Sequence, residues 1–423
     1  MAESYFRTTT PTGTEILIEP LSHVRSCSVG FWVRRGSTHE TATEEGLAHF
    51  IEHTVFKGTE RYPNPEAMSA ATDAVGGNVD AFTGKETACF YGKVLREQLP
   101  EMVALLGDLV TTPRFEAEEL ARERSVILEE IAQSEDQPDD WVSELFYLNF
   151  WKGGALAHPI LGRPEQVARY GAAEARAFFQ KTYRAPNILI AAAGDIDREA
   201  FLALLQPILE RLPGGGVREA PEVGTPKPFI LNTPRKDLQQ ASLILGFPAP
   251  GHRHGDRVAA NLLSHVLGGG MSSRLFMELR EKHALCYQIG SYLTHYRDGG
   301  ALQISASCAS DKARELVQRG AAECVRLAAK GATQEELDRA KLQARTSLVF
   351  SQESSSARMF ALAHQAIHMD DIRDLDAQIA EIDAVDLFQL NRVAQEILRP
   401  ENLAVSALGT KKQSEIRKAD LGG

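Results

Sequence analysis

Apolar and polar residues alternate along this chain with two periods, one typical of strands and one typical of helices, and the order of elements repeats once. Each half opens with apolar strand runs, continues with a helix and a pair of strands, passes through long helices and ends in an apolar strand. This repeated order predicts a duplicated α+β unit. The predicted strands are residues 15–18, 29–33, 77–83, 87–95 and 188–192 in the first half, and 229–231, 241–245, 286–293, 301–307 and 403–407 in the second.

A stretch rich in proline and glycine interrupts the pattern near the middle of the chain. It begins with PGGG, ends with GTPKP and follows neither a helical nor a strand period. Because a chain of 423 residues is long for a single hydrophobic core, we expect two domains. The sequence predicts an N-terminal domain at 1–212, a linker at 213–228 and a C-terminal domain at 229–423.

Composition narrows the class of protein. The net charge of −11 argues against a nucleic acid partner, because such binding depends on the neutralisation of phosphates. No apolar stretch approaches the length needed to span a bilayer, so we expect no membrane partner. Residues 1–7 lack the basic and apolar regions of an export signal. The five cysteines are scattered without a Cys-x-x-Cys pair, which favours reduced thiols and a cytoplasmic location.

The most informative local pattern is HFIEH at residues 49–53. His49 and His53 are four positions apart, so on a helix both imidazoles lie on one face and can reach a single ion. Glu52 lies between them, close enough to contact a water on that ion, and the order His-x-x-Glu-His is a known zinc hydrolase motif. Thr41 and Thr43 are the candidate caps for the start of this helix.

A catalytic zinc site also needs a third protein ligand and leaves its fourth position open to water. The candidates lie on a helix predicted to begin at about residue 116. Glu123 and Glu130 are seven residues apart and share one helical face, whereas Glu129 points about a quarter-turn away. One of these carboxylates would ligate the metal and another would orient a histidine. Helical periodicity alone does not choose between Glu129 and Glu130.

Several motifs together resemble those of the M16 metallopeptidases, the family that includes pitrilysin and the mitochondrial processing peptidase. The resemblance spans nearly the whole chain. The matching segments are GLAHFIEH at 46–53, FKGT at 56–59, GNVDAFT at 77–83, the acidic helix at 123–130, LGGGMSSRL at 267–275, and the pair Arg280 and Tyr287.

The resemblance implies a fold and a set of residue roles. The fold is α+β, with two homologous α/β-sandwich domains of the LuxS/M16 metallopeptidase type joined by a linker. His49, His53 and Glu130 become the ligands of one zinc ion per chain, and Glu130 is preferred to Glu129. In the catalytic centre, Glu52 is the general base and Glu123 the supporting carboxylate. The residues expected to bind substrate are Asn78, Ala81, Phe82 and Thr83 on a candidate edge strand, and Arg280 and Tyr287 from the second half.

These roles predict a zinc-dependent endopeptidase that hydrolyses peptides or unfolded segments inside a closed chamber, with the zinc-bound water activated by Glu52. Because one chain has both the metal motif and the Arg280/Tyr287 pair, a homodimer is the expected assembly. Two alternatives remain open. One is a specific processing peptidase that removes basic leader sequences, and the other is a non-catalytic partner subunit on the same fold.

Overall fold

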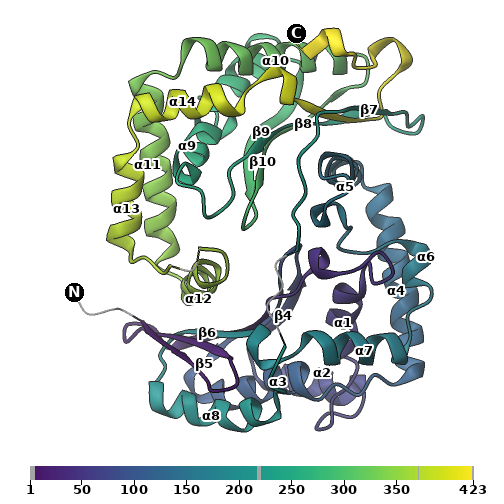
Figure 1. Cartoon of the computed structure of the whole chain (residues 1–423), viewed down its shortest axis with the longest axis vertical. Coiled ribbons are helices and arrows are strands. Elements are labelled where there is room, and N and C mark those ends of the chain that lie inside the picture. Colours follow the sequence, from purple (N-terminus) through teal and green to yellow (C-terminus); the bar gives the residue numbers. More distant parts are fainter. Residues whose placement is uncertain (1–4, 217–220, 370, 422–423) are drawn as a thin grey trace. The chain divides into compact units, whose positions relative to one another are not determined.

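The computed structural model describes residues 5–216, 221–369 and 371–421. Residues 217–220 of the predicted linker, and residues 1–4 of the segment expected to carry no export signal, lie outside the described residues. The chain forms two compact units (Figure 1). The first contains residues 1–133, 158–222 and 350–374, and the second contains residues 134–157, 223–349 and 375–423.

The first unit is built on a six-stranded sheet with the order β1-β2-β6-β3-β5-β4. β2 and β6 pair in parallel, and the other neighbouring strands are antiparallel. β4 lies at one edge, where it pairs only with β5 among the described strands. The strands are β1 (Phe6–Thr9), β2 (Glu15–Pro20), β3 (Ser26–Val33), β4 (Asn78–Thr83), β5 (Ala88–Leu95) and β6 (Ile188–Gly194).

The second unit repeats this topology in a five-stranded sheet with the order β7-β11-β8-β10-β9. Its parallel pair, β7 with β11, corresponds to β2 with β6. Its antiparallel strands β8, β10 and β9 follow in the same spatial order as β3, β5 and β4. The predicted duplication is therefore confirmed at the level of strand order, and β1 is an addition to the first sheet. The strands are β7 (Ile230–Thr233), β8 (Gln240–Ala249), β9 (Cys286–His295), β10 (Gly300–Ala309) and β11 (Ala404–Leu408).

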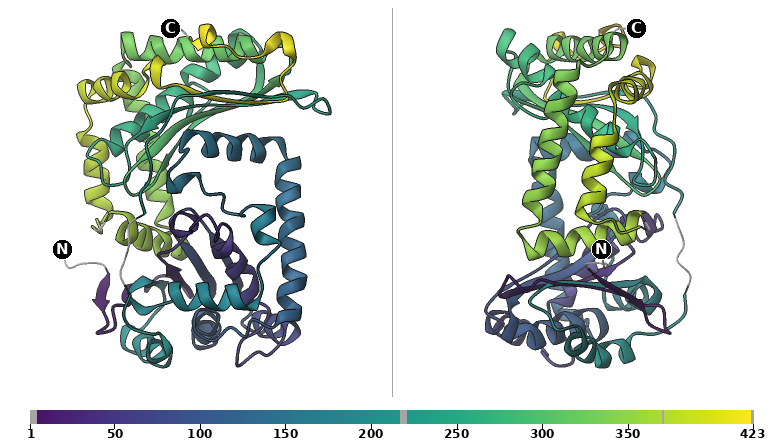
Figure 2. Two further views of the ribbon diagram at one scale, coloured as in Figure 1. Left: turned by 45° about the vertical axis from the view of Figure 1, so that its right-hand side comes forward. Right: turned by 90° about the vertical axis from the view of Figure 1, so that its left-hand side faces the viewer.

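Helices cover both faces of each sheet, which explains why the central strands are apolar along almost their whole length (Figure 2). In the first unit, α1, α3, α7 and α8 pack in one core, and α12 packs on the opposite face against β3 and β6. In the second unit, α9, α10 and α14 share one core, and α5 packs on the opposite face against β8 and β11. This arrangement confirms the predicted α/β-sandwich class.

Two helices belong to a different unit from the one that their position in the sequence would suggest. α5 precedes the predicted linker but belongs to the second unit, and α12 follows the linker but belongs to the first. The helices are α1 (Leu47–Val55), α2 (Pro65–Ala74), α3 (Leu99–Thr111), α4 (Ala117–Asp136), α5 (Pro138–Phe150), α6 (Pro164–Val167), α7 (Ala172–Thr182), α8 (Arg198–Arg211), α9 (Arg257–Gly268), α10 (Ala313–Lys330), α11 (Gln334–Ser351), α12 (Ser355–His364), α13 (Leu375–Ala384) and α14 (Leu387–Ile397). Among the described helices, none has the length and apolar character that crossing a bilayer requires.

Candidate metal centre

Helix α1 holds two imidazoles close together in the first unit. The Nε2 atoms of His49 and His53 are 3.2 Å apart, and their ring centroids are 4.5 Å apart. The helix begins after Gly46, whose φ of 90° lies in the left-handed region that glycine adopts most readily. Thr41 and Thr43 do not cap it, so that prediction was wrong.

The carboxylate that joins the two histidines comes from α4. Glu130 Oε2 lies 3.5 Å from His53 Nε2 and 3.8 Å from His49 Nε2. Among the described residues, these three side chains form the one group of at least three possible ligands whose donor atoms lie within 4.8 Å of one another. Glu129 is exposed and lies outside this group.

The other nitrogen of His53 is held by a second carboxylate of α4. His53 Nδ1 lies 2.9 Å from Glu123 Oε1, and the Lys57 ammonium lies 2.7 Å from Glu123 Oε2. Burial works to raise the pKa of Glu123, but its bonds to His53 and Lys57 outweigh burial and lower that pKa. Burial works to lower the pKa of His53, but the bond to Glu123 and the surrounding carboxylates raise it. In contrast, burial and the neighbouring His53 lower the pKa of His49 to about 3.

Glu52 projects from α1 towards strand β4. The hydroxyl of Thr83, the last residue of β4, donates a hydrogen bond of 2.5 Å to Glu52 Oε2. Burial raises the pKa of Glu52, although the Thr83 bond and the charge of His53 oppose this. A carboxylate with a raised pKa accepts a proton more readily, as a general base requires.

The four residues predicted on the substrate-binding strand all lie in β4, the edge strand. Successive side chains of a strand point to opposite faces. Ala81 shares a face with Thr83 and packs against the main core of the first unit. Asn78 and Phe82 lie on the other face, where Phe82 contacts the rings of Tyr91 and Phe360. In an antiparallel pair only every second residue turns its backbone groups away from the partner strand, so the four residues do not all offer these groups at the edge. The Ala81 N–H donates a bond of 2.8 Å to Asp80 Oδ1. An edge strand of this kind can add an extended peptide as a further strand.

Arg280 and Tyr287 lie close together in the second unit. The Arg280 guanidinium lies 4.9 Å from the centroid of the Tyr287 ring and 4.6 Å from that of Phe276. Ser307 pairs with Gln288 and Cys308 pairs with Cys286, so Tyr287 is the extra residue of a β-bulge in β9. A bulge redirects the side chain it carries. Consistent with this, Tyr287 is 77% exposed.

The donor set of the first unit fits a divalent cation. If His53 Nδ1 donates its proton to Glu123, His53 Nε2 presents a lone pair to the His49 ring. Two lone pairs 3.2 Å apart repel each other unless a proton or a cation lies between them. Glu130 Oε2 is buried beside them without a hydrogen-bond partner among the described residues. Two imidazoles and one carboxylate are the ligand types of a catalytic zinc site.

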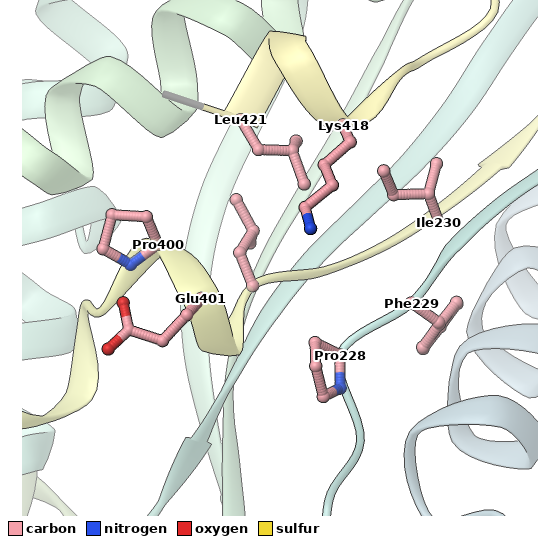
Figure 3. Close-up of a pocket in the computed structure, with 8 residues that line it drawn as sticks. Pro228, Phe229, Ile230, Pro400, Glu401, Lys418 and Leu421 are labelled. Carbon is pink, nitrogen blue, oxygen red and sulfur yellow. The ribbon is translucent and has the colours of Figure 1, made fainter. Parts of the chain in front are cut away.

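The second unit contains an open pocket of about 630 Å³ (Figure 3). Its lining includes none of the predicted site residues and is mostly apolar. In the view of Figure 3, the Lys418 side chain extends towards the middle of the pocket and the Glu401 carboxylate points to one side. The lining residues are Pro228, Phe229, Ile230, Pro400, Glu401, Leu403, Lys418 and Leu421.

The sequence alone did not identify three supporting contacts. Lys57 was assigned no role, although it pairs with Glu123. Thr83 was expected to contact substrate, and its bond to Glu52 was not foreseen. Glu40, which accepts hydrogen bonds from the start of α1, matches no local motif. The Lys57–Glu123 and Thr83–Glu52 contacts join segments that only folding brings together, whereas Glu40 lies six and eight residues before its two partners.

A duplicated α+β fold is thus combined with a cluster of two histidines from a His-x-x-Glu-His helix and one glutamate from α4, which defines the class of the M16 metallopeptidases. Residues 15–164 match the family described as insulinase (peptidase family M16), and residues 171–344 match the peptidase M16 inactive domain. The chain belongs to the M16 peptidase family.

The chain is similar over most of its length to relatives named as uncharacterized zinc proteases. The relative from Mycobacterium tuberculosis is 35% identical over 93% of this chain and 90% of its own length. That from Streptomyces coelicolor is 33% identical over 98% of this chain and 92% of its own. That from Bacillus subtilis is 33% identical over 92% of this chain and 95% of its own.

Solved structures share the fold at lower sequence identity. A protease from Helicobacter pylori matches with a TM-score of 0.88 and 22% identity, over 96% of this chain and 99% of that one. A peptidase M16 inactive domain from Pseudomonas fluorescens matches with a TM-score of 0.89 and 21% identity, over 96% and 98%. A chain of complex III2 from Candida albicans matches with a TM-score of 0.84 and 17% identity, over 98% of both chains.

Proposed function

We propose that this protein is a zinc-dependent endopeptidase that hydrolyses peptides or unfolded segments inside a closed chamber. The observation that carries the proposal is the convergence of His49, His53 and Glu130 beside the half-buried carboxylate of Glu52. In this assignment the first three residues hold one zinc ion per chain. The relatives named as zinc proteases support the same choice of metal.

Bound zinc would supply a Lewis acid that lowers the pKa of a coordinated water and polarises a carbonyl. Glu52 then takes the proton of the attacking water on its carboxylate and later delivers it to the leaving amine. Thr83 fixes the orientation of this carboxylate through its hydroxyl. Glu123 fixes the His53 ring and its tautomer by accepting the Nδ1 proton.

The substrate is proposed to bind as an extended strand along the edge of β4. Backbone groups at the free edge of a sheet are available to pair with an incoming peptide. Ala81 lies in this edge, two residues before the Thr83 that holds Glu52, so a peptide paired there lies next to the general base. Arg280 and Tyr287 are proposed to donate hydrogen bonds to the substrate backbone or to the oxygen that becomes negative.

The direct test of the proposed catalysis is the Glu52→Gln variant. We expect it to bind zinc as the wild type does, because Glu52 is not a ligand, and to lower kcat by about 10²–10⁴-fold. Glu60→Gln is the matched control, because Glu60 is exposed and follows α1 closely in the sequence. Wild-type turnover by Glu52→Gln would remove Glu52 from the proposed role.

A peptide-library digestion with and without a chelator, read by mass spectrometry, tests the reaction and its substrate class. Cleavage that stops with chelator supports a zinc endopeptidase. A strong preference for Arg-rich leader peptides over neutral peptides would instead favour the alternative of a specific processing peptidase. The net charge of −11 is the feature that makes basic peptides plausible substrates.

A non-catalytic partner subunit is the second candidate function. It is supported by the match of residues 171–344 to the peptidase M16 inactive domain and by the fold shared with a chain of complex III2. Against it, the whole His-x-x-Glu-His motif is present in this chain. A purified chain that binds zinc but cleaves no peptide would favour this alternative.

We further propose that the protein is a cytoplasmic homodimer. All five cysteines are buried free thiols, as is common in a reducing compartment. A single kind of chain carries both the metal cluster and the Arg280/Tyr287 pair, so two identical chains contain every element of the proposed mechanism. Light scattering that shows a stable monomer with full peptidase activity would contradict the dimer.

A further inference from the structure

The loop at residues 36–40 contacts both structural elements that carry the proposed catalytic groups. At one end, the Ser37 and Thr38 N–H groups donate to the carbonyl oxygens of Gly84 and Lys85, in the turn that follows β4, at 3.2 and 2.8 Å. The Thr38 hydroxyl donates a further bond of 2.7 Å to Lys85 O. These three bonds fix the position of the β4–β5 turn, directly after Thr83.

At its other end, the same loop binds the start of α1 through Glu40. Glu40 Oε2 accepts from Gly46 N–H at 2.8 Å, and Glu40 Oε1 accepts from Ala48 N–H at 2.7 Å. The first N–H groups of a helix have no partner within the helix, and Gly46 has no side chain to serve as a cap. Glu40 is buried, with 4% of its surface exposed. Glu40, six residues before the N-cap residue Gly46, therefore provides the acceptor oxygens that a capping side chain would normally supply.

We infer that Glu40 is a positioning residue for the metal centre, and that residues 36–40 set the register of α1 against β4. His49 directly follows Ala48, so the backbone of the first histidine is fixed by the Glu40 bond. The Glu52–Thr83 hydrogen bond joins the same two elements directly. The inference rests on the proposed zinc peptidase function and adds to it a determinant of the ligand geometry.

The close packing of the loop supports a positioning role. A Cβ atom at Gly36 would lie 2.3 Å from Gly84 O and 2.6 Å from Lys85 O, and both are backbone atoms that no side-chain rotation can move away. A Cβ atom at Gly46 would lie 2.7 Å from Gly162 Cα. The loop and the start of α1 are thus both fixed by backbone contacts, which limits their freedom to move independently.

The experiment compares Glu40→Met, which has a similar length but no acceptor oxygen, with Glu40→Gln, which keeps one acceptor oxygen. We expect Glu40→Met to weaken zinc binding about 10–100-fold, the usual effect of losing support for a metal ligand, and to lower kcat more than it raises KM. Glu40→Gln should lie between the wild type and Glu40→Met. Zinc affinity is measured by competition with a chromophoric chelator and needs no activity.

The control is Glu44→Gln, between this loop and α1, whose carboxylate binds Thr41 and Lys181 and not α1. It should bind zinc as the wild type does. If Glu40→Met folds by circular dichroism and binds zinc with wild-type affinity and kcat, Glu40 has only a structural role and the inference fails. If Glu40→Met does not fold, Thr38→Val provides the test, because it removes the hydroxyl contacts to Lys85 O and His39 Nδ1 and keeps the Thr38 N–H bond to Lys85 O.

Thr38→Val should lower kcat with a smaller effect on zinc affinity, and an unchanged kcat would overturn the inference. A double-mutant cycle with Thr83→Val adds a second readout. If Thr38 acts through the Glu52–Thr83 contact, the two effects on kcat are not additive. These outcomes differ from failure of the proposed function itself, in which the wild-type chain would bind no zinc or cleave no peptide.

Discussion

His53 lies between two carboxylates of one helix: its Nδ1 atom is 2.9 Å from Glu123 and its Nε2 atom is 3.5 Å from Glu130. The seven-residue separation of the two glutamates places them on one face of α4. One imidazole therefore has one nitrogen oriented by a hydrogen bond and the other directed towards the candidate metal position. Such carboxylate–histidine pairs fix the tautomer and raise the basicity of a metal ligand.

The Glu123→Gln variant tests this relationship. An amide at this position can donate as well as accept, so the His53 tautomer is no longer fixed, and we expect zinc affinity to fall about 10–100-fold. Zinc competition titration measures the change. Glu118→Gln, on the exposed surface of the same helix, should leave the affinity unchanged. Equal zinc affinity in Glu123→Gln and the wild type would remove Glu123 from its supporting role.

Thr83→Val tests the bond that orients the general base. Valine keeps the shape of threonine and removes the hydroxyl that donates to Glu52. A hydrogen bond to a charged group contributes about 1.5–3 kcal/mol, so kcat should fall about 10–100-fold while zinc content stays at the wild-type level. Steady-state kinetics and metal analysis of the same preparation give both values. An unchanged kcat would show that Glu52 is positioned without Thr83.

Arg280→Met tests the proposed role of the second unit in substrate binding. The guanidinium stacks on Tyr287, and its one ion-pair contact among the described residues is with Glu281 at 3.8 Å. Its loss should therefore cost little stability. We expect kcat/KM to fall about 10–100-fold, as for the loss of a hydrogen-bond donor to the reacting oxygen, with the melting temperature unchanged. Arg297→Met, in the same unit, is the control. A wild-type kcat/KM for Arg280→Met would contradict the assignment.

The ion pair between Arg274 and Glu336 gives the second unit a predictable pH dependence. Arg274 binds both oxygens of Glu336, at 2.7 and 2.8 Å. Burial works to raise the pKa of Glu336, but Arg274 and the backbone of Thr333 lower it below its ordinary value of 4.5. The pair therefore stabilises the fold above about pH 4.5, and this contribution is lost as the pH falls through the lower, folded-state pKa.

We expect Glu336→Gln to lower the free energy of unfolding by roughly 2 kcal/mol at neutral pH, with a smaller difference from the wild type in acid. Urea unfolding at a series of pH values measures both effects. Glu335→Gln is the neighbouring control, because Glu335 is exposed and, within the described part of the chain, forms an ion pair only with Arg339. A difference that grows as the pH falls would contradict the sign of this argument.

Local periodicity was sufficient to predict much of the fold and the placement of two histidines on one face of α1. The strands and their repeated order follow from apolar runs, and the spacing of His49 and His53 follows from the pitch of a helix. Periodicity did not choose between Glu129 and Glu130, because adjacent helical residues differ by only about 100° in direction. The choice depends on which side of α4 faces α1, and that is set by tertiary packing.

The contacts that sequence reasoning missed depend on how distant segments meet. Helix α5 packs against β8, and α12 packs against β3. This packing is decided by tertiary structure, and no local sequence pattern predicted it. The start of α1 was misassigned because Thr41 and Thr43 satisfy the usual cap preference, whereas the helix begins at a left-handed glycine capped by Glu40. The sequence preferences for helix caps concern the residue at the helix start, so they do not predict an acceptor as distant in sequence as Glu40.

The most direct test of the account compares the zinc content of purified Glu130→Ala and Glu129→Ala. The substitutions are adjacent and equally compatible with a helix, but only Glu130 lies beside the two histidines. We predict that Glu129→Ala keeps one zinc per chain and that Glu130→Ala loses most of it. Full zinc occupancy with wild-type affinity in Glu130→Ala would contradict the proposed metal centre.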